Sequence, residues 1–243
     1  MSWEAPAVIV VIPAYNEEES IRGVLEKLKA ITPDYDVVVV DDGSWDRTAQ
    51  VVAAIPGIRL LCLPFNLGIG GAMQTGFKYA LREGYGIAVQ CDADGQHPVE
   101  QIPALVARIN DGSADVIIGS RYVADSDYQP SVLRRVGKSL LSRWIDFLIG
   151  GGVTDTTSGF RALNRNALAV FAQNYPEDYP EPEALVILHR NGLRCAEIPV
   201  QMSPRQGGST SIRPQGALYY MVKVALAVLI DMFRKYAPPG DRG

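Results

Sequence analysis

The sequence is poor in the residues that build disulfide frameworks and zinc sites. It contains three cysteines, an odd number, and two histidines among 243 residues. Cys62, Cys91 and Cys195 each lie in or beside an apolar run, and their spacing is not that of a zinc site. We therefore interpret them as small buried side chains in a protein of a reducing compartment.

The sequence also lacks an excess of basic residues and a long uninterrupted apolar segment. Its net charge of −4 gives no reason to expect nucleic acid as a partner. The first residues show neither the basic region nor the apolar region of a secretory signal, which predicts a cytoplasmic location. The most apolar segment, residues 217–233, contains Lys223 and Asp231 and falls short of the roughly 20 apolar residues of a spanning helix.

Short apolar runs alternate with amphipathic segments through the first half of the chain. The runs predict buried strands at residues 7–12, 35–40, 58–63, 87–89 and 116–118, with helices at 17–30, 48–54, 72–82 and 99–110. Further on, we predict helices at 131–149 and 183–190, a strand at 193–201 and a loop at 203–215. Strands that are apolar on both faces and alternate with helices indicate an α/β fold with a mostly parallel sheet flanked by helices.

The segment after the fourth run carries side-chain oxygens at alternating positions, on Asp92, Asp94 and Gln96. Ligands bind at the carboxyl ends of strands in such sheets, and clustered acids there need a cation. Oxygen ligands suit Mg²⁺ or Mn²⁺ holding a diphosphate. For Asp-x-Asp alone a solvated turn is the simpler interpretation, but the other strand-terminal segments favour a nucleotide site.

Three such segments follow the first three strands. They are Pro13-Ala-Tyr-Asn-Glu-Glu-Glu, Asp41-Asp-Gly-Ser and Asn66-Leu-Gly-Ile-Gly-Gly-Ala. A carboxylate after the second strand can accept hydrogen bonds from a ribose or a base. Small residues at the start of a helix allow a nucleotide to approach the backbone, and the helix N-terminus favours negative charge.

Together, in this order, these motifs resemble the family 2 glycosyltransferases of the GT-A fold, which is Rossmann-like. The resemblance extends over residues 7–215 and is closest to the polyprenyl-phosphate glycosyltransferases, which include the dolichyl-phosphate mannose synthases. The motifs that carry it are Val11-Ile-Pro-Ala-Tyr-Asn-Glu-Glu, Val39-Val-Asp-Asp-Gly-Ser, Asn66-x-Gly68, Asp92-Ala-Asp-Gly-Gln-His-Pro, Gly119-Ser-Arg-Tyr and Ser158-Gly-Phe-Arg.

The resemblance implies roles for individual residues on the donor side. It places the nucleotide against residues of the first three motifs: Pro13, Tyr15, Glu17, Asp41, Asp42, Asn66 and Gly68. Asp92 is implied to face the nucleotide sugar, and the metal set is Asp92, Asp94 and Gln96. The implied cofactor is Mg²⁺ or Mn²⁺, and Asp94 is the implied centre of catalysis.

The resemblance further implies that Arg121 and Arg205 bind either the acceptor phosphate or the diphosphate, and a planar guanidinium can bind phosphate through two hydrogen bonds. Arg134 and Arg135 could assist, and Ser158 belongs to a matching motif. A phosphate acceptor needs no general base, whereas a hydroxyl acceptor does. Candidate bases are Asp155, Glu181 and Glu183. Asp155 could instead brace the turn at Ser158, and the glutamates could simply favour a helix N-terminus.

The expected activity is inverting, metal-dependent transfer of a sugar from a nucleoside diphosphate to a polyprenyl phosphate. Alternatives are the same fold acting on a hydroxyl of a glycan, protein or small molecule, a sugar-nucleotide pyrophosphorylase, and a non-catalytic homologue. We expect a catalytic domain at 1–215, then an amphipathic helix and tail at 216–243. Residues 217–236, with 131–149, could face the membrane or a partner protein, which predicts a peripheral protein at the cytoplasmic face; packing into the core is the alternative.

Overall fold

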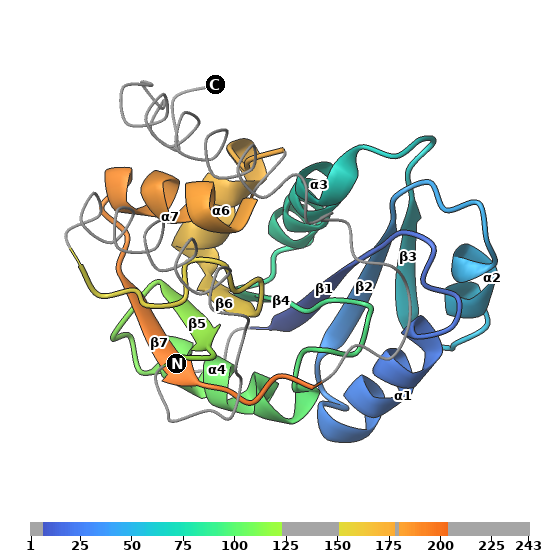
Figure 1. Cartoon of the computed structure of the whole chain (residues 1–243), viewed down its shortest axis with the longest axis horizontal. Helices are drawn as coiled ribbons and strands as arrows, with labels where there is room; N and C mark the ends of the chain where they lie inside the picture. The colour runs from blue at the N-terminus through green and yellow to red at the C-terminus, as the bar shows by residue number, and fades with distance from the viewer. Residues whose placement is uncertain (1–6, 123–150, 178–179, 204–243) are drawn as a thin grey trace, which may run out of the picture.

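Within the part of the chain that the structure describes, seven strands form one mixed sheet in the order β3-β2-β1-β4-β6-β5-β7 (Figure 1). The structure is a computed structural model that describes residues 7–122, 151–177 and 180–203. Pairing is parallel between β1, β2, β3 and β4 and between β5 and β7, whereas β6 is antiparallel to both of its neighbours. The strands are β1 (Val8–Ala14), β2 (Asp36–Asp41), β3 (Ile58–Cys62), β4 (Ile87–Gln90), β5 (Val116–Ser120), β6 (Arg161–Asn164) and β7 (Cys195–Pro199).

Helices cover both faces of this sheet, as the apolar strands predict. On one face lie α3 (Gly68–Arg82), α6 (Arg165–Gln173) and α7 (Pro180–Arg190), and on the other α1 (Ile21–Ile31), α2 (Thr48–Ala53), η1 (Val99–Gln101) and α4 (Ile102–Asn110). In β1, Ile9 and Val11 pack toward the first set, and Val10 and Ile12 toward the second. Alternate side chains therefore feed two separate cores, and the predicted α/β class is confirmed.

Several helices begin at residues other than those predicted. The helix α1 begins at Ile21 and not at residue 17, because residues 17–20 form a turn. The helix α3 begins four residues earlier than predicted, at Gly68, and α7 begins at Pro180. Proline at the start of a helix costs little, because the first N–H groups have no partner within the helix.

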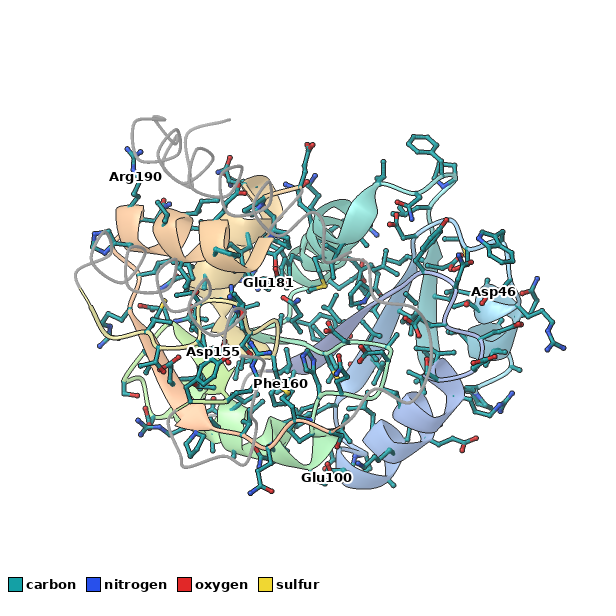
Figure 2. The ribbon with its side chains drawn as sticks, viewed as in Figure 1. Asp46, Glu100, Asp155, Phe160, Glu181 and Arg190 are labelled. Atoms are coloured by element: carbon teal, nitrogen blue, oxygen red, sulfur yellow. The ribbon has the colours of Figure 1, made fainter. Side chains whose placement is uncertain are left out.

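Figure 2 shows Glu100 of η1 between α4 and α1, where it pairs with Lys27 at 2.5 Å.

The strand β6 and the helix α6 were not predicted. The strand has only four residues and carries Arg161 at one end and Asn164 at the other, so it shows no apolar run. Its position between β4 and β5 buries it, and that position depends on pairing between distant segments. Asn164 then caps α6, where its Oδ1 accepts a hydrogen bond from the amide of Ala167 at 3.0 Å.

Several predicted segments lie outside the described residues: the helix at 131–149, the loop at 204–215 and the amphipathic segment at 217–236. The boundary at residue 215 therefore stays a prediction. Among the helices of the described ranges, none combines the length and apolarity needed to cross a membrane.

Close packing of α3 on the sheet leads to a stability prediction. A Cβ added to Gly76 would overlap the buried side chain of Val11 in β1, whereas a Cβ on the exposed Gly23 of α1 would meet nothing within 4 Å. We expect Gly76→Ala to lower the free energy of unfolding by about 1–3 kcal/mol. The matched change Gly23→Ala should raise it by roughly 0.5–1 kcal/mol, because alanine favours the helix. Denaturant titration measures both, and equal effects would contradict the packing argument.

Candidate active site

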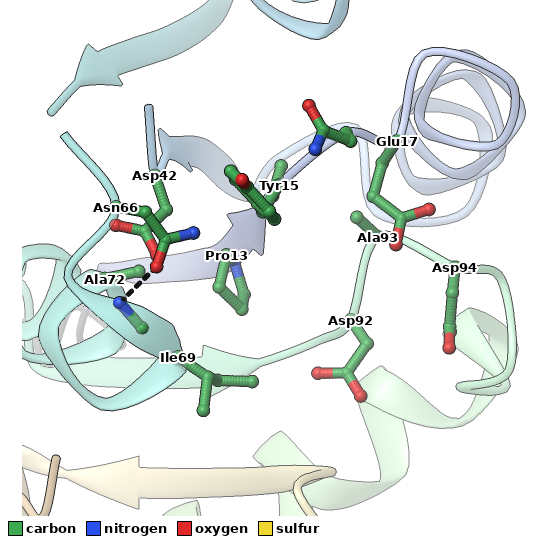
Figure 3. A pocket seen from close by; sticks show the side chains of 13 residues that line it. Pro13, Tyr15, Glu17, Asp42, Asn66, Ile69, Ala72, Asp92, Ala93 and Asp94 are labelled. Carbon is green, nitrogen blue, oxygen red and sulfur yellow. Dashed lines mark hydrogen bonds between the residues drawn. The ribbon is translucent and has the colours of Figure 1, made fainter. Parts of the chain in front are cut away.

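A cleft of about 530 Å³ opens at the carboxyl end of the parallel strands, where β1 lies between β2 and β4 (Figure 3). The chain runs from β1 outward to β3 and then returns to β4 on the other side, which makes this edge a topological switch point. The cleft has a volume typical of small-molecule sites. Its lining residues follow β1, β2, β3 and β4: Pro13, Ala14, Tyr15, Asn16, Glu17, Asp42, Asn66, Gly68, Ile69, Ala72, Asp92, Ala93 and Asp94.

The wall that follows β2 is built on the carboxylate of Asp42. This side chain is buried, and its Oδ1 accepts a hydrogen bond from the amide of Leu67 at 2.7 Å. Burial raises the pKa of Asp42, while the amides of Leu67 and Gly68 act in the opposite direction. Gly43, with φ of +71°, permits the turn, because a Cβ there would stand 2.8 Å from the carbonyl carbon of Phe65. Asp41 is buried beside this wall and does not line the cleft.

The loop after β1 is fastened to the loop after β2. Asn16 has φ of 57°, its amide donates to Ser44 Oγ at 2.9 Å, and its Oδ1 accepts from the amide of Trp45 at 3.0 Å. The amide of Glu17 donates to Thr48 Oγ1 at 2.8 Å. These contacts hold Tyr15, which is 44% exposed, and Glu17 at the cleft before any ligand binds.

Asp92 and Asp94 extend from the loop after β4 and line the cleft together (Figure 3). The amide of Asp92 donates to Nδ1 of His97 at 2.9 Å, so the Nε2 of that ring, 3.4 Å from Asp92 Oδ2, carries the proton. The imidazole is buried and stacks against Phe160 with ring centroids 5.0 Å apart. His97, for which the sequence suggested no definite role, therefore positions Asp92.

The oxygen set at this loop fits a divalent ion of the Mg²⁺ or Mn²⁺ type. Asp94 is 4% exposed, and its Oδ1 accepts from the amide of Gln96 at 3.0 Å; the Gln96 side chain does not line the cleft. Residues 7–122, 151–177 and 180–203 contain no group of three or more His, Cys, Asp or Glu side chains arranged to hold a metal. Mg²⁺ characteristically uses one or two carboxylates and takes its other ligands from phosphates and water. Two carboxylates at an open cleft match that pattern.

Arg121 lies in a second polar cluster, just after β5. Its Nε and Nη2 donate to the two carboxylate oxygens of Asp155, each at 2.7 Å, and Nη2 also donates to Thr157 Oγ1 at 2.8 Å. The Asp155 side chain is fully buried, and the backbone amide of Arg121 also donates to it at 3.1 Å. A carboxylate held in this way orients the Arg121 guanidinium, which disfavours the proton-accepting role considered for Asp155 and is a different contact from the predicted brace of the turn at Ser158.

The remaining predicted residues have different positions. Ser158 is buried, and its Oγ donates to the carbonyl of Gly119 at 2.6 Å, which fastens its turn to β5. Glu183 is buried in the first turn of α7. Arg134, Arg135 and Arg205 lie outside the described residues.

Sequence reasoning missed Glu197, which supports the Arg121 cluster. This residue of β7 accepts hydrogen bonds from the amide of Thr154 at 3.0 Å, from Thr154 Oγ1 at 2.7 Å and from the amide of Asp155 at 2.7 Å. No local pattern marks it, since its partners lie 42 and 43 residues away in the chain.

The mostly parallel sheet, with carboxylates at its switch-point cleft, defines an α/β protein of the class that binds ligands at the carboxyl ends of its strands. The family model described as glycosyl transferase family 2 matches residues 9–171. The chain belongs to glycosyl transferase family 2, and the resemblance read from its motifs is confirmed.

Three curated relatives have names that refer to a dolichyl, polyprenol or undecaprenyl carrier. The chain is 34% identical over 215 residues to a UDP-N-acetylglucosamine–dolichyl-phosphate N-acetylglucosaminyltransferase of Methanococcus voltae, covering 80% of this chain and 84% of that one. It is 31% identical over 229 residues to a polyprenol monophosphomannose synthase of Mycolicibacterium smegmatis, covering 89% and 85%. It is 32% identical over 213 residues to an undecaprenyl-phosphate mannosyltransferase of Micrococcus luteus, covering 84% and 87%.

Among solved structures, glucosyl-3-phosphoglycerate synthase of Mycobacterium tuberculosis shares the fold. The TM-score is 0.71 at 23% identity, over 96% of this chain and 82% of that one. That structure contains Mn²⁺, UDP and glucosyl-3-phosphoglycerate. The likeness confirms the GT-A architecture predicted from the sequence.

Proposed function

We propose that this protein transfers a hexose from a nucleoside diphosphate sugar to a polyprenyl phosphate, with Mg²⁺ or Mn²⁺ as cofactor. The observation that carries the proposal is the pair Asp92 and Asp94 at the switch-point cleft, whose opposite wall is built on Asp42. The names of the three relatives support the choice of a lipid phosphate as acceptor.

On the donor side, the nucleoside occupies the wall between Tyr15 and Asp42, and the diphosphate extends toward Asp94. Asp42 and Glu17 accept hydrogen bonds from ribose hydroxyls or the base, because ionised carboxylates act only as acceptors. Asp92 and Asp94, assisted by Gln96, would hold the metal, and the bound metal would stabilise the leaving diphosphate as a Lewis acid. Asp41 is assigned a supporting position behind Asp42.

On the acceptor side, Arg121 binds the lipid phosphate. Asp155 and Thr157 hold its guanidinium in one orientation, so little conformational entropy is lost when the phosphate arrives. A phosphate oxygen attacks the anomeric carbon as the bond from that carbon to the diphosphate breaks, and the configuration inverts. The acceptor is already ionised and requires no general base, which agrees with the engagement of Asp155 by Arg121.

The acceptor in this proposal is a membrane lipid, so the reaction takes place at a membrane surface with the protein bound peripherally. The segment 217–236 and the arginines Arg134, Arg135 and Arg205 are proposed to contribute to the surface that receives the lipid.

The test is a panel of sugar nucleotides, based on uridine and guanosine, offered to the full chain with Mn²⁺ and a short-chain polyprenyl phosphate. We expect one donor to release its nucleoside diphosphate only when the lipid phosphate is present, with a glycolipid product of inverted anomeric configuration by NMR. The control acceptor is the corresponding polyprenol, which lacks the phosphate. Equal turnover with the polyprenol would refute the acceptor assignment, and a retained configuration would refute the single displacement.

A further inference from the structure

A buried polar cluster lies beneath the first turn of α7, beside the cleft but not among its lining residues. Gln90, the last residue of β4, stands directly opposite Arg161, the first residue of β6, in the antiparallel register. Each is 1% exposed. The hydroxyl of Tyr175 donates to Gln90 Oε1 at 3.2 Å, and Arg161 donates to the carbonyl of Ser158 at 2.7 Å and to that of Glu181 at 2.8 Å.

Two donors of this cluster have no acceptor among the described residues. They are Nε2 of Gln90 and Nη1 of Arg161. Buried donors are nearly always satisfied, so two neighbouring exceptions in one place call for an oxygen-bearing partner. These two N–H donors also favour the ionised form of the nearby carboxyl group of Glu181.

Glu181 faces this cluster from the end of α7 that lies nearest the middle of the molecule (Figure 2). A Cβ on Gly159 would stand 3.0 Å from Gln90 Nε2 and 3.7 Å from Glu181 Oε1, so both side chains reach the space that this glycine leaves open. Burial raises the pKa of Glu181, the charge of Arg161 lowers it, and Asp92 and Arg121 are near enough to act on it as well. Glu181 is therefore within electrostatic range of both the donor-side aspartate and the acceptor-side arginine.

We propose that the carboxylate of Glu181 accepts hydrogen bonds from hydroxyl groups of the sugar being transferred, with Arg161 and Gln90 as the residues that position it. This inference rests on the proposed function and assigns the sugar subsite within it. An ionised carboxylate offers only acceptors, so its natural partners are hydroxyl donors, and it repels the phosphates of both substrates. The carboxylate of Glu181 thus favours a neutral sugar at this position and disfavours a phosphate.

The experiment compares Glu181→Gln and Glu181→Ala with the full chain in the presence of Mn²⁺. The matched control is Glu177→Gln, an exposed glutamate of the preceding segment. Two pairs of probes are used: UDP with UDP-N-acetylglucosamine, and GDP with GDP-mannose. We expect both Glu181 variants to bind the sugar nucleotide roughly 10- to 100-fold more weakly, as for loss of hydrogen bonds to a charged group, and to bind the nucleoside diphosphate as the unchanged protein does.

Two further readouts separate a ligand role from a structural one. Sugar nucleotides that each lack one sugar hydroxyl should bind the unchanged protein more weakly. Glu181→Ala should bind the analogue that lacks the contacted hydroxyl as well as it binds the complete sugar nucleotide. Because burial disfavours the ionised carboxylate, Glu181→Gln should keep or raise the melting temperature at neutral pH.

Equal weakening of nucleoside diphosphate and sugar nucleotide, or a melting temperature that falls in Glu181→Gln, would overturn the assignment in favour of a structural ion pair with Arg161. Unchanged binding of every probe by the Glu181 variants would overturn it while the proposed function stands. If the unchanged protein binds neither sugar nucleotide more tightly than its nucleoside diphosphate and transfers no sugar, the proposed function fails, and this subsite with it.

Discussion

Asp94→Asn is expected to reduce the rate of sugar transfer by about 100- to 1,000-fold, the usual cost of removing one stabilising group at a developing charge. The side chain is buried at the cleft, where its charge acts in a medium of low dielectric constant. Asparagine keeps an Oδ1 that can accept from the amide of Gln96, so the loop after β4 retains its shape. The loss should therefore reflect the missing charge and not a rearranged loop.

The measurement is the initial rate of nucleoside diphosphate release, together with the affinity for the nucleotide with and without Mn²⁺. In the unchanged protein, Mn²⁺ should tighten nucleotide binding, and in Asp94→Asn this enhancement should largely vanish. Asp34→Asn, an exposed aspartate before β2, serves as the control and should behave as the unchanged protein. Full activity in Asp94→Asn would refute the metal role of this residue.

Arg121→Lys is expected to lower the efficiency of transfer to the lipid phosphate by about 100-fold, because an ammonium group cannot keep the contacts with Asp155 and Thr157 and also present an N–H to the phosphate in one fixed orientation. The affinity for the sugar nucleotide should stay the same, since Arg121 does not line the donor cleft. A steady-state analysis in which the acceptor concentration is varied separates the two. Equal losses for donor and acceptor would contradict the assignment of Arg121 to the acceptor.

Removing the guanidinium altogether tests the ion pair itself. Arg121→Ala removes the positive charge that faces the fully buried carboxylate of Asp155, and we expect a loss of about 3–5 kcal/mol in the free energy of unfolding. The double change Arg121→Ala with Asp155→Ala removes both charges and should restore part of that stability. A double variant that is less stable than Arg121→Ala would contradict a net cost from the buried negative charge of Asp155.

The two clusters divide the site according to the charge of the partner that each would bind. The donor cleft carries the carboxylates of Asp42, Asp92 and Asp94, whereas the cluster after β5 presents Arg121. An acidic cleft takes up a diphosphate only with a cation, and a guanidinium takes up a phosphate directly. This division explains why binding of the nucleoside diphosphate sugar is proposed to depend on a metal, whereas binding of the lipid phosphate is not.

How far the sequence predicts this protein can be followed residue by residue. The segments after β1, β2, β3 and β4 were predicted to meet at one edge, and eight of the residues chosen there line the cleft: Pro13, Tyr15, Glu17, Asp42, Asn66, Gly68, Asp92 and Asp94. By contrast, Ser158 was chosen from a motif, and its hydroxyl is used inside the fold, on the carbonyl of Gly119. A motif identifies a conspicuous polar residue but does not tell which way its side chain turns.

The sequence by itself determined the parallel sheet and its acidic edge. Strands buried on both faces must be apolar throughout, and the carboxyl ends of parallel strands share one edge whatever the details of packing. Only the tertiary structure decided the strand β6, the brace of Asp155 and Glu197 around Arg121, and the position of Glu181 over Arg161 and Gln90. Those polar contacts join residues that are at least 20 positions apart in the chain, and β6 is buried by its neighbours in the sheet, so no local pattern could encode them.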